Sequence, residues 1–344
     1  MVNNPGCNTQ NMKSGPKNKL GVPNPIKRKI MTTETNNSPP PELSKSKEPS
    51  SLYKDAIRHL IQKKSAVLGV IILILLALIA LSAPLVAPFD PEEQLIGVED
   101  GIKKRSPPCI HALGCSPETP QHIFGVDANF RDFFSRIVYG ARLSLSVGFT
   151  AVTIAIVSGT ILGSVAGFVG GWVDNIIMRL MDVFLAFPAL ILAIAIVTVL
   201  GPGLINALLA ISVVTIPIYA RVIRSSVLTV KEQDFILADR ALGVPPARIL
   251  IRDVLPNAIT PLIVQGTLGI GTAIVEVAAL SFLGLGAQPP TPEWGLMVSA
   301  ERNQVFTAPF LVFIPGLAIM LVVLGFNLLG DGLQDALNPR LNRR

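Results

Sequence analysis

Charged residues are scarce in this sequence. They make up 15% of its 344 residues, whereas an average soluble domain carries about 25%. Half of the residues are hydrophobic, and the mean hydropathy is +0.55. This composition excludes a disordered scaffold, a secreted domain and a soluble enzyme, and it indicates a membrane protein.

Cysteine and histidine are also scarce, with three of each. Three cysteines are too few for a disulfide framework, and no group of Cys and His has the spacing of a zinc site. We therefore expect neither a metal nor a cofactor. Cys109 and Cys115 lie six positions apart, and the sequence is compatible either with a disulfide between them or with two free thiols.

The net charge of +6 does not indicate nucleic acid as a partner. Of the 29 Lys and Arg residues, 12 lie within residues 1–65, ahead of the first long hydrophobic run. Basic residues in this position set the orientation of a membrane protein and meet membrane lipid. We therefore expect no nucleic-acid partner.

The residues ahead of the first hydrophobic run fall into two parts. Residues 1–50 are rich in Pro, Asn, Ser, Thr and Lys, and such a segment cannot bury enough apolar surface to offset its chain entropy. We predict a disordered cytoplasmic tail. Residues 51–65 have apolar positions at helical spacing with cations between them, which predicts an amphipathic helix before the membrane. Residues 1–30 have no fold-forming pattern, so a translation start at Met31 is a further hypothesis.

Six hydrophobic runs are long enough to cross a bilayer, which takes roughly 20 helical residues. The predicted spans are residues 66–88, 143–169, 183–201, 204–220, 259–285 and 309–329. The fold class is therefore an all-α polytopic membrane protein. The remaining parts are a loop over residues 89–142, a core over residues 143–330 and a C-terminus over residues 331–344.

The distribution of Lys and Arg predicts the orientation of the chain. With the N-terminus inside, 22 of these 29 residues lie on the cytoplasmic side. Six of the other seven lie in the long loop 89–142, where the charge rule is weak. We therefore predict that both termini are cytoplasmic and that the loop 89–142 is extracytoplasmic.

Small residues and prolines interrupt the predicted spans. Gly159, Gly163 and Gly167 recur at every fourth position of the second span, where small residues let two helices approach closely. This pattern predicts a contact between helices. Three prolines inside spans predict either simple bends or the lining of a pathway. They are Pro188, Pro217 and Pro315.

Glu276 lies inside the fifth predicted span, between Val275 and Val277. A carboxylate within the membrane is costly, so it is a functional candidate. It either meets a substrate amine in a pathway or forms a hydrogen bond between helices. In both cases we expect it to face a pathway or a subunit interface rather than lipid.

The largest predicted cytoplasmic loop, residues 221–258, has an ordered pattern. Apolar spacing predicts a helix over residues 222–242, and Gly243 follows at a position where glycine commonly ends a helix. Prolines can then begin a second short helix, over residues 246–254, which ends at Leu255-Pro256. Two helices and a glycine turn between spans would form a protrusion suited to a groove in a partner.

This loop resembles the EAA loop of ABC importer permeases. The matching residues are Ala238, Asp239, Arg240, Ala241, Leu242 and Gly243, with Leu255 and Pro256 at the family's distance after the glycine. The resemblance is closest to the C-type permease subunit of dipeptide, oligopeptide and nickel importers, and it covers about residues 66–341. Further matching stretches are residues 124–127, 131–132, 139–145, 170–174, 280–286, 288–295 and 326–333. The acidic residue that begins the family's EAA run falls on Leu237, and Asp239 lies about 200° further around the helix.

The resemblance implies a type I ABC importer permease fold in the bacterial inner membrane. It implies a second, B-type permease subunit, two ABC ATPase subunits and an extracytoplasmic substrate-binding protein as partners. The sequence contains no G-x-x-x-x-G-K-[S/T] phosphate loop. We therefore expect ATP hydrolysis in the partner subunits, and no enzyme activity in this chain. The EAA loop would couple ATPase motion to alternating access.

The sequence leaves the substrate open among dipeptides, longer peptides and nickel complexes, and it does not decide between a homodimer and a heterodimer of permeases. The alternative function is a stand-alone secondary transporter or channel. Such a protein would need its own ion or proton relay, and Glu276 is nearly the only acidic residue in the middle of a span.

Overall fold

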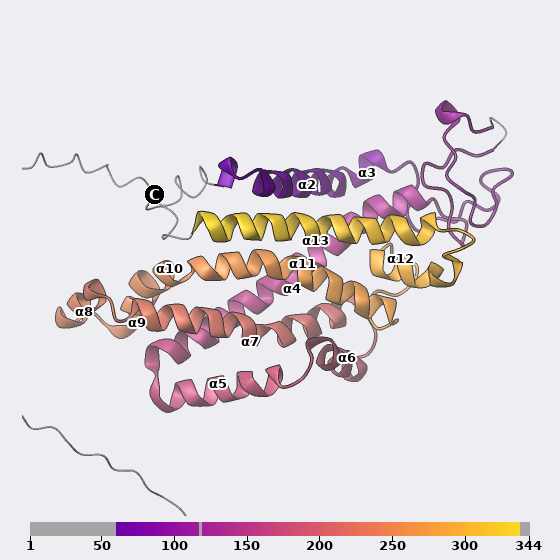
Figure 1. Ribbon diagram of the computed structural model, residues 1–344. Coiled ribbons are helices and arrows are strands. Elements are labelled where there is room, and N and C mark those ends of the chain that lie inside the picture. The colour runs from indigo at the N-terminus through magenta and orange to yellow at the C-terminus, as the bar shows by residue number, and fades with distance from the viewer. Residues whose placement is uncertain (1–59, 117–118, 338–344) are drawn as a thin grey trace, which may run out of the picture. The chain divides into compact units, whose positions relative to one another are not determined.

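The computed structural model describes residues 60–116 and 119–337, which belong to one structural unit (Figure 1). The predicted tail over residues 1–50, the proposed start at Met31 and most of the predicted helix over residues 51–65 lie outside the described residues. The described part is helical and contains only isolated β-bridges.

Five helices are long and apolar enough to cross a membrane. They are α2 (Lys64–Leu81), α4 (Phe133–Val169), α7 (Leu204–Val230), α11 (Thr260–Phe282) and α13 (Phe310–Ala336). A sixth candidate span is the pair α5 (Gly171–Leu185) and α6 (Ala189–Leu200), which are bent by 91°. The short helices are α3 (Ala83–Val86), α8 (Asp234–Ala241), α9 (Pro246–Arg248), α10 (Leu255–Ala258) and α12 (Trp294–Glu301). The 3-10 turns are η1 (His111–Leu113) and η3 (Arg302–Gln304), and η2 (Ile249–Val254) is a π-helix.

The third predicted span, residues 183–201, is wrong as a single helix, because the helix is interrupted between α5 and α6. Pro188 has no amide hydrogen, and it disfavours helical angles at the residue before it. α5 is held to α7 by Asp174, which accepts hydrogen bonds of 2.5 and 2.6 Å from the guanidinium of Arg224. Both α5 and α6 therefore pack against α7, although the break turns α6 by 91° relative to α5.

The second span begins at Phe133, ten residues before the predicted start. Asp132 caps this helix, and its carboxylate accepts a hydrogen bond of 2.7 Å from the amide of Ser135. Arg136 is buried, and its guanidinium donates to the carbonyl oxygen of Pro290 over 3.0 Å. These polar residues lower the hydropathy of the first turns, so the hydrophobic pattern missed them.

The first and last predicted spans also end elsewhere. α2 ends at Leu81 rather than at residue 88, because the chain turns at Ser82 into the short α3. α13 continues to Ala336, beyond the predicted end at residue 329. An ion pair between Lys63 and Asp335 joins the start of α2 to the end of α13.

The predicted glycine contact is confirmed, and it lies between α4 and α7. A Cβ atom on Gly159 would stand 2.8 Å from Cβ of Tyr219, and one on Gly163 would overlap the carbonyl oxygen of Ala220. The backbones of the two helices therefore approach more closely than any larger residue would allow.

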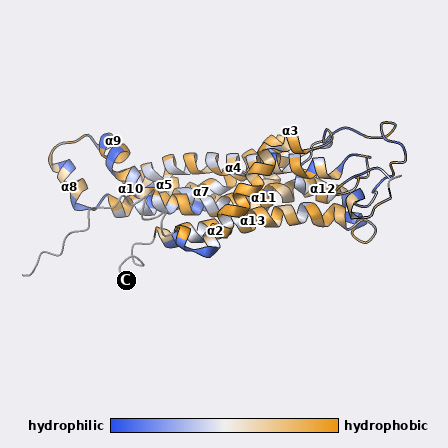
Figure 2. Cartoon of the chain, turned by 90° about the horizontal axis from the view of Figure 1, so that it is seen from above, coloured by the Kyte–Doolittle hydropathy of each residue, from blue (hydrophilic) through white to orange (hydrophobic). Residues whose placement is uncertain are grey.

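The long helices place polar segments at two opposite ends. Figure 2 shows hydrophobic colour along these helices and more hydrophilic colour at both ends. We call the part with α8, α9, η2 and α10 the α8 end. We call the part with residues 87–116, residues 119–132 and α12 the α12 end (Figure 1).

Candidate functional site

The predicted helix over residues 222–242 is in fact two helices. α7 continues to Val230, and a turn over residues 231–233 precedes α8. Lys231 fastens this turn to α4, since its ammonium donates a hydrogen bond of 2.9 Å to the carbonyl oxygen of Gly167. The apolar pattern runs through the turn because Val230 and Ile236 both pack in the same core.

The glycine turn expected after the first loop helix is present. Gly243 follows α8 with a φ angle of +76°, a left-handed conformation that favours glycine. The amide of Gly243 donates a hydrogen bond of 3.0 Å to the carbonyl oxygen of Arg240. The amide of Val244 donates a hydrogen bond of 3.1 Å to the carbonyl oxygen of Asp239. This pair of hydrogen bonds is a Schellman motif. No atom lies within 4 Å of the place where a Cβ would stand, so only the backbone angle requires glycine.

The second loop helix does not end at Leu255-Pro256 as predicted. Residues 246–258 form α9, η2 and α10 without a break in the helical path. The π-helix changes the hydrogen-bond register, and Pro256 then falls in the first turn of α10, where its missing amide hydrogen costs little. The sequence pattern did not reveal this change of register.

The α8 end presents apolar side chains that the described part of the chain leaves exposed. Ile236 is fully buried and anchors α8, whereas the side chain of Leu242 is 81% exposed. Leu237, at the position of the family's acidic residue, is 47% exposed, and Ile251 is also exposed. Among the predicted coupling residues, Ala238, Arg240, Ala241, Gly243 and Pro256 are exposed, and Asp239 and Leu255 are half-buried. An exposed apolar patch of this kind indicates a protein partner.

Glu276 is half-buried on α11, and its Oε2 is buried without a hydrogen-bond partner among the described residues. Helical spacing places Gln265, Gly269 and Thr272 on the same face. Tyr219 of α7 packs against Gly269 on this face. The structure places no cation beside this carboxylate within the described part of the chain.

At the α12 end, the structure contains a disulfide between Cys109 and Cys115, whose Cα atoms are 5.5 Å apart. The hydroxyl of Thr119 lies 3.2 and 3.1 Å from the two sulfur atoms. The bridge therefore closes the short loop that contains η1.

Most buried charges of the α12 end are paired within the chain. Asp127 accepts hydrogen bonds from Nε of Arg131 over 2.8 Å and from the amide of Asn129 over 2.7 Å. Glu301 of α12 accepts a hydrogen bond of 2.9 Å from Nε of Arg105. Arg136 of α4 also lies 3.6 Å from Asp127. Because these pairs join the loop to α12 and to α4, they make this end a rigid cap.

His122 is a residue whose role the sequence did not reveal. Its Nδ1 lies 2.8 Å from Asp132 and its Nε2 lies 2.9 Å from Glu99, and the side chain is 2% exposed. Burial would lower the pKa of His122, but the hydrogen bond and charge of Asp132, helped by Glu99, outweigh it and raise that pKa above 6.5. Only the tertiary structure brings the two carboxylates to the imidazole.

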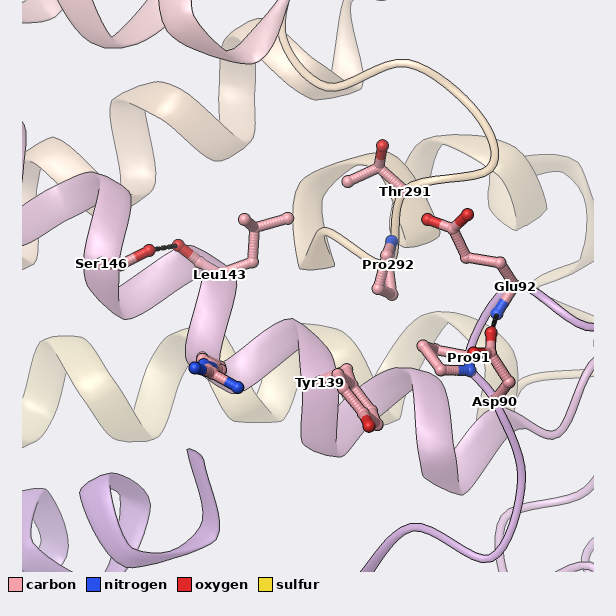
Figure 3. Close-up of a pocket in the computed structure, with 9 residues that line it drawn as sticks. Asp90, Pro91, Glu92, Tyr139, Leu143, Ser146, Thr291 and Pro292 are labelled. Atoms are coloured by element: carbon pink, nitrogen blue, oxygen red, sulfur yellow. Dashed lines mark hydrogen bonds between the residues drawn. The ribbon is translucent and has the colours of Figure 1, made fainter. Parts of the chain in front are cut away.

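A pocket of about 510 Å³ opens at the α12 end beside α4 (Figure 3). Three segments contribute its lining, namely the chain after α3, one face of α4 and the chain before α12. The lining residues are Asp90, Pro91, Glu92, Tyr139, Arg142, Leu143, Ser146, Thr291 and Pro292. Carboxylates, a guanidinium, hydroxyls and apolar surface thus share one cavity.

Known proteins share both the sequence and the fold of this chain. Residues 159–343 match the family described as binding-protein-dependent transport system inner membrane component, and residues 51–108 match the N-terminal TM domain of oligopeptide transport permease C. A dipeptide transport system permease protein DppC from Alkalihalophilus pseudofirmus is 48% identical, over 91% of this chain and 97% of its own.

Two further relatives and one solved structure are informative. A di/tripeptide transport system permease protein DppC from Pseudomonas aeruginosa is 44% identical, over 86% of this chain and 95% of its own. A glutathione transport system permease protein GsiD from Escherichia coli O157:H7 is 43% identical, over 83% of this chain and 89% of its own. A chain of the inward-facing MetNI methionine ABC transporter covers 59% of this chain and 96% of its own, with a TM-score of 0.50 and 19% identity. This last likeness concerns the fold alone.

Proposed function

Because the chain belongs to the family of binding-protein-dependent transport system inner membrane components, we propose that it is the permease subunit through which an ABC importer moves short peptides. Its fold is that of a type I permease, in a multi-pass membrane protein. The relatives named for dipeptides, di- and tripeptides and glutathione support a peptide substrate. None of these three is named for nickel.

The α8 end lies in the cytoplasm and the α12 end lies outside in this proposal. The positive-inside rule supports this orientation, because the basic residues before α2 and after α7 then fall on the same side. The disulfide at the α12 end agrees with it, since disulfides persist in oxidising compartments outside the cytoplasm.

The α8 end couples this subunit to an ATPase. The observation that carries this assignment is the exposed apolar surface of Leu237, Leu242 and Ile251 on a protrusion anchored by Ile236. The turn at Gly243 fixes the direction of the protrusion. An apolar contact would replace the ionic contact that the family's acidic residue implied at the position of Leu237.

The remaining partners are a B-type permease subunit, a second ATPase subunit and an extracytoplasmic binding protein. Glu276 faces the pathway or the interface with the other permease. Its buried and unpaired Oε2 supports this position, because a carboxylate without a partner would be costly against lipid. A substrate amine or a polar group of the partner would supply the missing hydrogen bond.

A reconstituted system tests the function. The chain is coexpressed with the permease, ATPases and binding protein encoded beside it, and uptake of a labelled dipeptide into proteoliposomes is measured. We expect uptake that requires both ATP and the binding protein. Uptake by this chain alone, driven by an ion gradient, would instead support a secondary transporter.

The coupling role has its own test. Leu242→Glu places a charge on the exposed apolar surface and should release the ATPase subunits during purification. Glu232→Gln, at an exposed residue ahead of α8, is the matched control. Retention of the ATPases by Leu242→Glu, with normal uptake, would show that this surface is not the contact.

A further inference from the structure

The two arginines of α4 have different surroundings. Arg136 is buried, and its guanidinium donates hydrogen bonds of 2.8 and 3.0 Å to the carbonyl oxygens of Pro91 and Pro290. Arg142 is exposed, and its side chain forms no hydrogen bond or ion pair with any described residue. Because an arginine facing lipid is costly, the open guanidinium indicates a position that faces water or a ligand.

Two carboxylates line the same pocket as Arg142. Asp90 accepts a hydrogen bond of 2.8 Å from the amide of Glu92, and neither carboxylate forms an ion pair with a described residue. Figure 3 shows Asp90 and Glu92 on one side of the pocket and Leu143 and Ser146 on the other. Arg142 immediately precedes Leu143 on α4, so the pocket is lined by charges of opposite sign that form no ion pair with a described residue.

These open charges contrast with the buried ones of the same end. Asp127, Asp132 and Glu301 each have a cationic or histidine partner within the chain. The chain therefore satisfies the charges that hold the α12 end together and leaves those of the pocket available to a ligand.

The pocket has the size and the chemistry of a site for a small zwitterion. Its volume of about 510 Å³ lies within the range of about 300–1,000 Å³ that is common for small-molecule sites. A short peptide carries a terminal ammonium and a terminal carboxylate at opposite ends. Tyr139 and Leu143 add apolar surface for its side chains, and Thr291 adds a polar group.

We propose that this pocket binds a short peptide as it leaves the binding protein, with the peptide's carboxylate at Arg142 and its ammonium at Asp90 and Glu92. The assignment rests on the proposed function as a peptide permease. Charge-assisted hydrogen bonds at both ends would orient the peptide and select for free termini.

The face of α4 that leads away from the pocket carries exposed hydroxyl side chains. Ser146, Thr150 and Thr153 are exposed and follow Arg142 at helical spacing. The exposed face of α2 is instead apolar along its length, with Leu68, Ile71, Leu75 and Leu78. α2 therefore presents a uniformly apolar face, whereas this face of α4 combines hydroxyl groups with the exposed apolar side chains of Phe149 and Val157.

Photo-crosslinking of the complete importer tests the site directly. The assembled complex is placed in nanodiscs of phosphatidylcholine, without the binding protein, and labelled with a dipeptide that carries a diazirine side chain. We expect labelled residues within 90–92 or 139–146. An excess of unmodified dipeptide should prevent the labelling, whereas an N-acetylated and C-amidated dipeptide should not.

Substitutions then test which charged residues of the pocket bind the two peptide termini. Arg142→Gln and Glu92→Gln should each reduce labelling about tenfold, because each removes one charge-assisted contact. Glu93→Gln, at the adjacent exposed carboxylate outside the pocket, should leave it unchanged. Copurification of the partner subunits checks that each variant assembles, and the competition experiment in the unmodified protein does not depend on any variant.

Three results would overturn the proposal. Labelling outside the pocket would remove the site, and equal competition by the blocked dipeptide would remove the recognition of termini. Loss of labelling on addition of phosphatidylethanolamine, whose headgroup is also a zwitterion, would assign the pocket to lipid. If any of these occurs while the unmodified importer transports dipeptide with ATP, the proposed function stands and only the pocket assignment fails.

Discussion

The two ends of the molecule differ in the side chains of their ordered segments, since the α12 end buries paired charges and the α8 end exposes apolar residues on a defined turn. At the α12 end, His122, Asp127, Asp132 and Glu301 are nearly inaccessible, and each has a partner within the chain. At the α8 end, Leu242 is 81% exposed, although its backbone is held in a defined turn. The buried charges of the first end are paired by its own side chains, whereas the second end presents exposed apolar side chains on an ordered turn. Substitutions at the two ends should therefore fail in different ways.

Asp132→Ala should have the largest effect on stability, because it removes buried interactions that hold the α12 end together. The substitution removes the cap of α4 and one of the two carboxylates at His122. Loss of one partner of a buried charged pair costs about 3–5 kcal/mol, so we expect the protein to accumulate poorly. Membrane levels measured by immunoblot check this, with the exposed Asp100→Ala as control. Equal levels of the two variants would contradict the rigid cap.

Gly243→Val, at the α8 end, should have the next largest effect, and this effect should be on transport. A β-branched residue at a φ of +76° is strained by about 1–3 kcal/mol, although it has room for its side chain. The protrusion should change direction, so dipeptide uptake and ATPase retention should fall severalfold while membrane levels stay normal. Normal uptake would show that this loop does not couple the subunits.

The control for Gly243→Val follows from the structure. Lys231 is exposed to only an intermediate degree, and it holds the carbonyl oxygen of Gly167. Lys231→Ala would therefore loosen the contact between α4 and the loop. Glu232→Ala, at an exposed residue for which no side-chain contact is found in the described part of the chain, is the better control.

Loss of the disulfide should have a smaller effect on transport. The bridge closes a loop with a sequence separation of only 6 residues, so its removal should destabilise that loop by about 2 kcal/mol without displacing α4. We expect a bridged peptide in a non-reducing digest, and uptake within twofold of normal for Cys109→Ser combined with Cys115→Ser. The same two free-thiol peptides in reducing and non-reducing digests would exclude the bridge.

The smallest effect should come from pH. The pKa of His122 in the folded protein is raised above 6.5, so the stabilisation from its protonated form is fully present below about pH 6.5. This stabilisation is lost as the pH rises through the raised pKa. The protection factors of the amides in residues 95–101, which correct for the intrinsic pH dependence of hydrogen exchange, should therefore fall at alkaline pH, and His122→Gln should remove this fall. An unchanged pH profile in His122→Gln would assign the effect to another group.

Much of the fold could be predicted from local sequence. Apolar length located most of the spans, and three glycines at every fourth position predicted a contact between helices, which the structure places between α4 and α7. The glycine turn after α8 was also predictable, because Gly243 stands between a helical pattern and two prolines. Each of these features depends on residues that are close together in the chain.

The errors fall where polar residues take part in helices. The first turns of α4 contain Arg136, whose charge is satisfied by carbonyl groups more than 40 residues away. The register change in η2 likewise depends on packing and backbone hydrogen bonds, whereas the break between α5 and α6 lies at Pro188, one of the prolines for which a bend was predicted. Hydropathy could not reveal these features because it does not record which partner a polar group will find.

The sequence by itself therefore determined that the chain is a helical membrane protein with a loop that resembles the EAA loop of ABC importer permeases. Composition and periodicity are properties of a single segment, and they suffice to predict which segments cross the membrane. The tertiary structure alone decided which charges are satisfied and which stay open. It brought Glu99 and Asp132 to His122, and among the described residues it left Arg142 without an ion-pair partner in the pocket that Asp90 also lines. Electrostatic pairing depends on distances between segments remote in sequence, and only the packed helices set those distances.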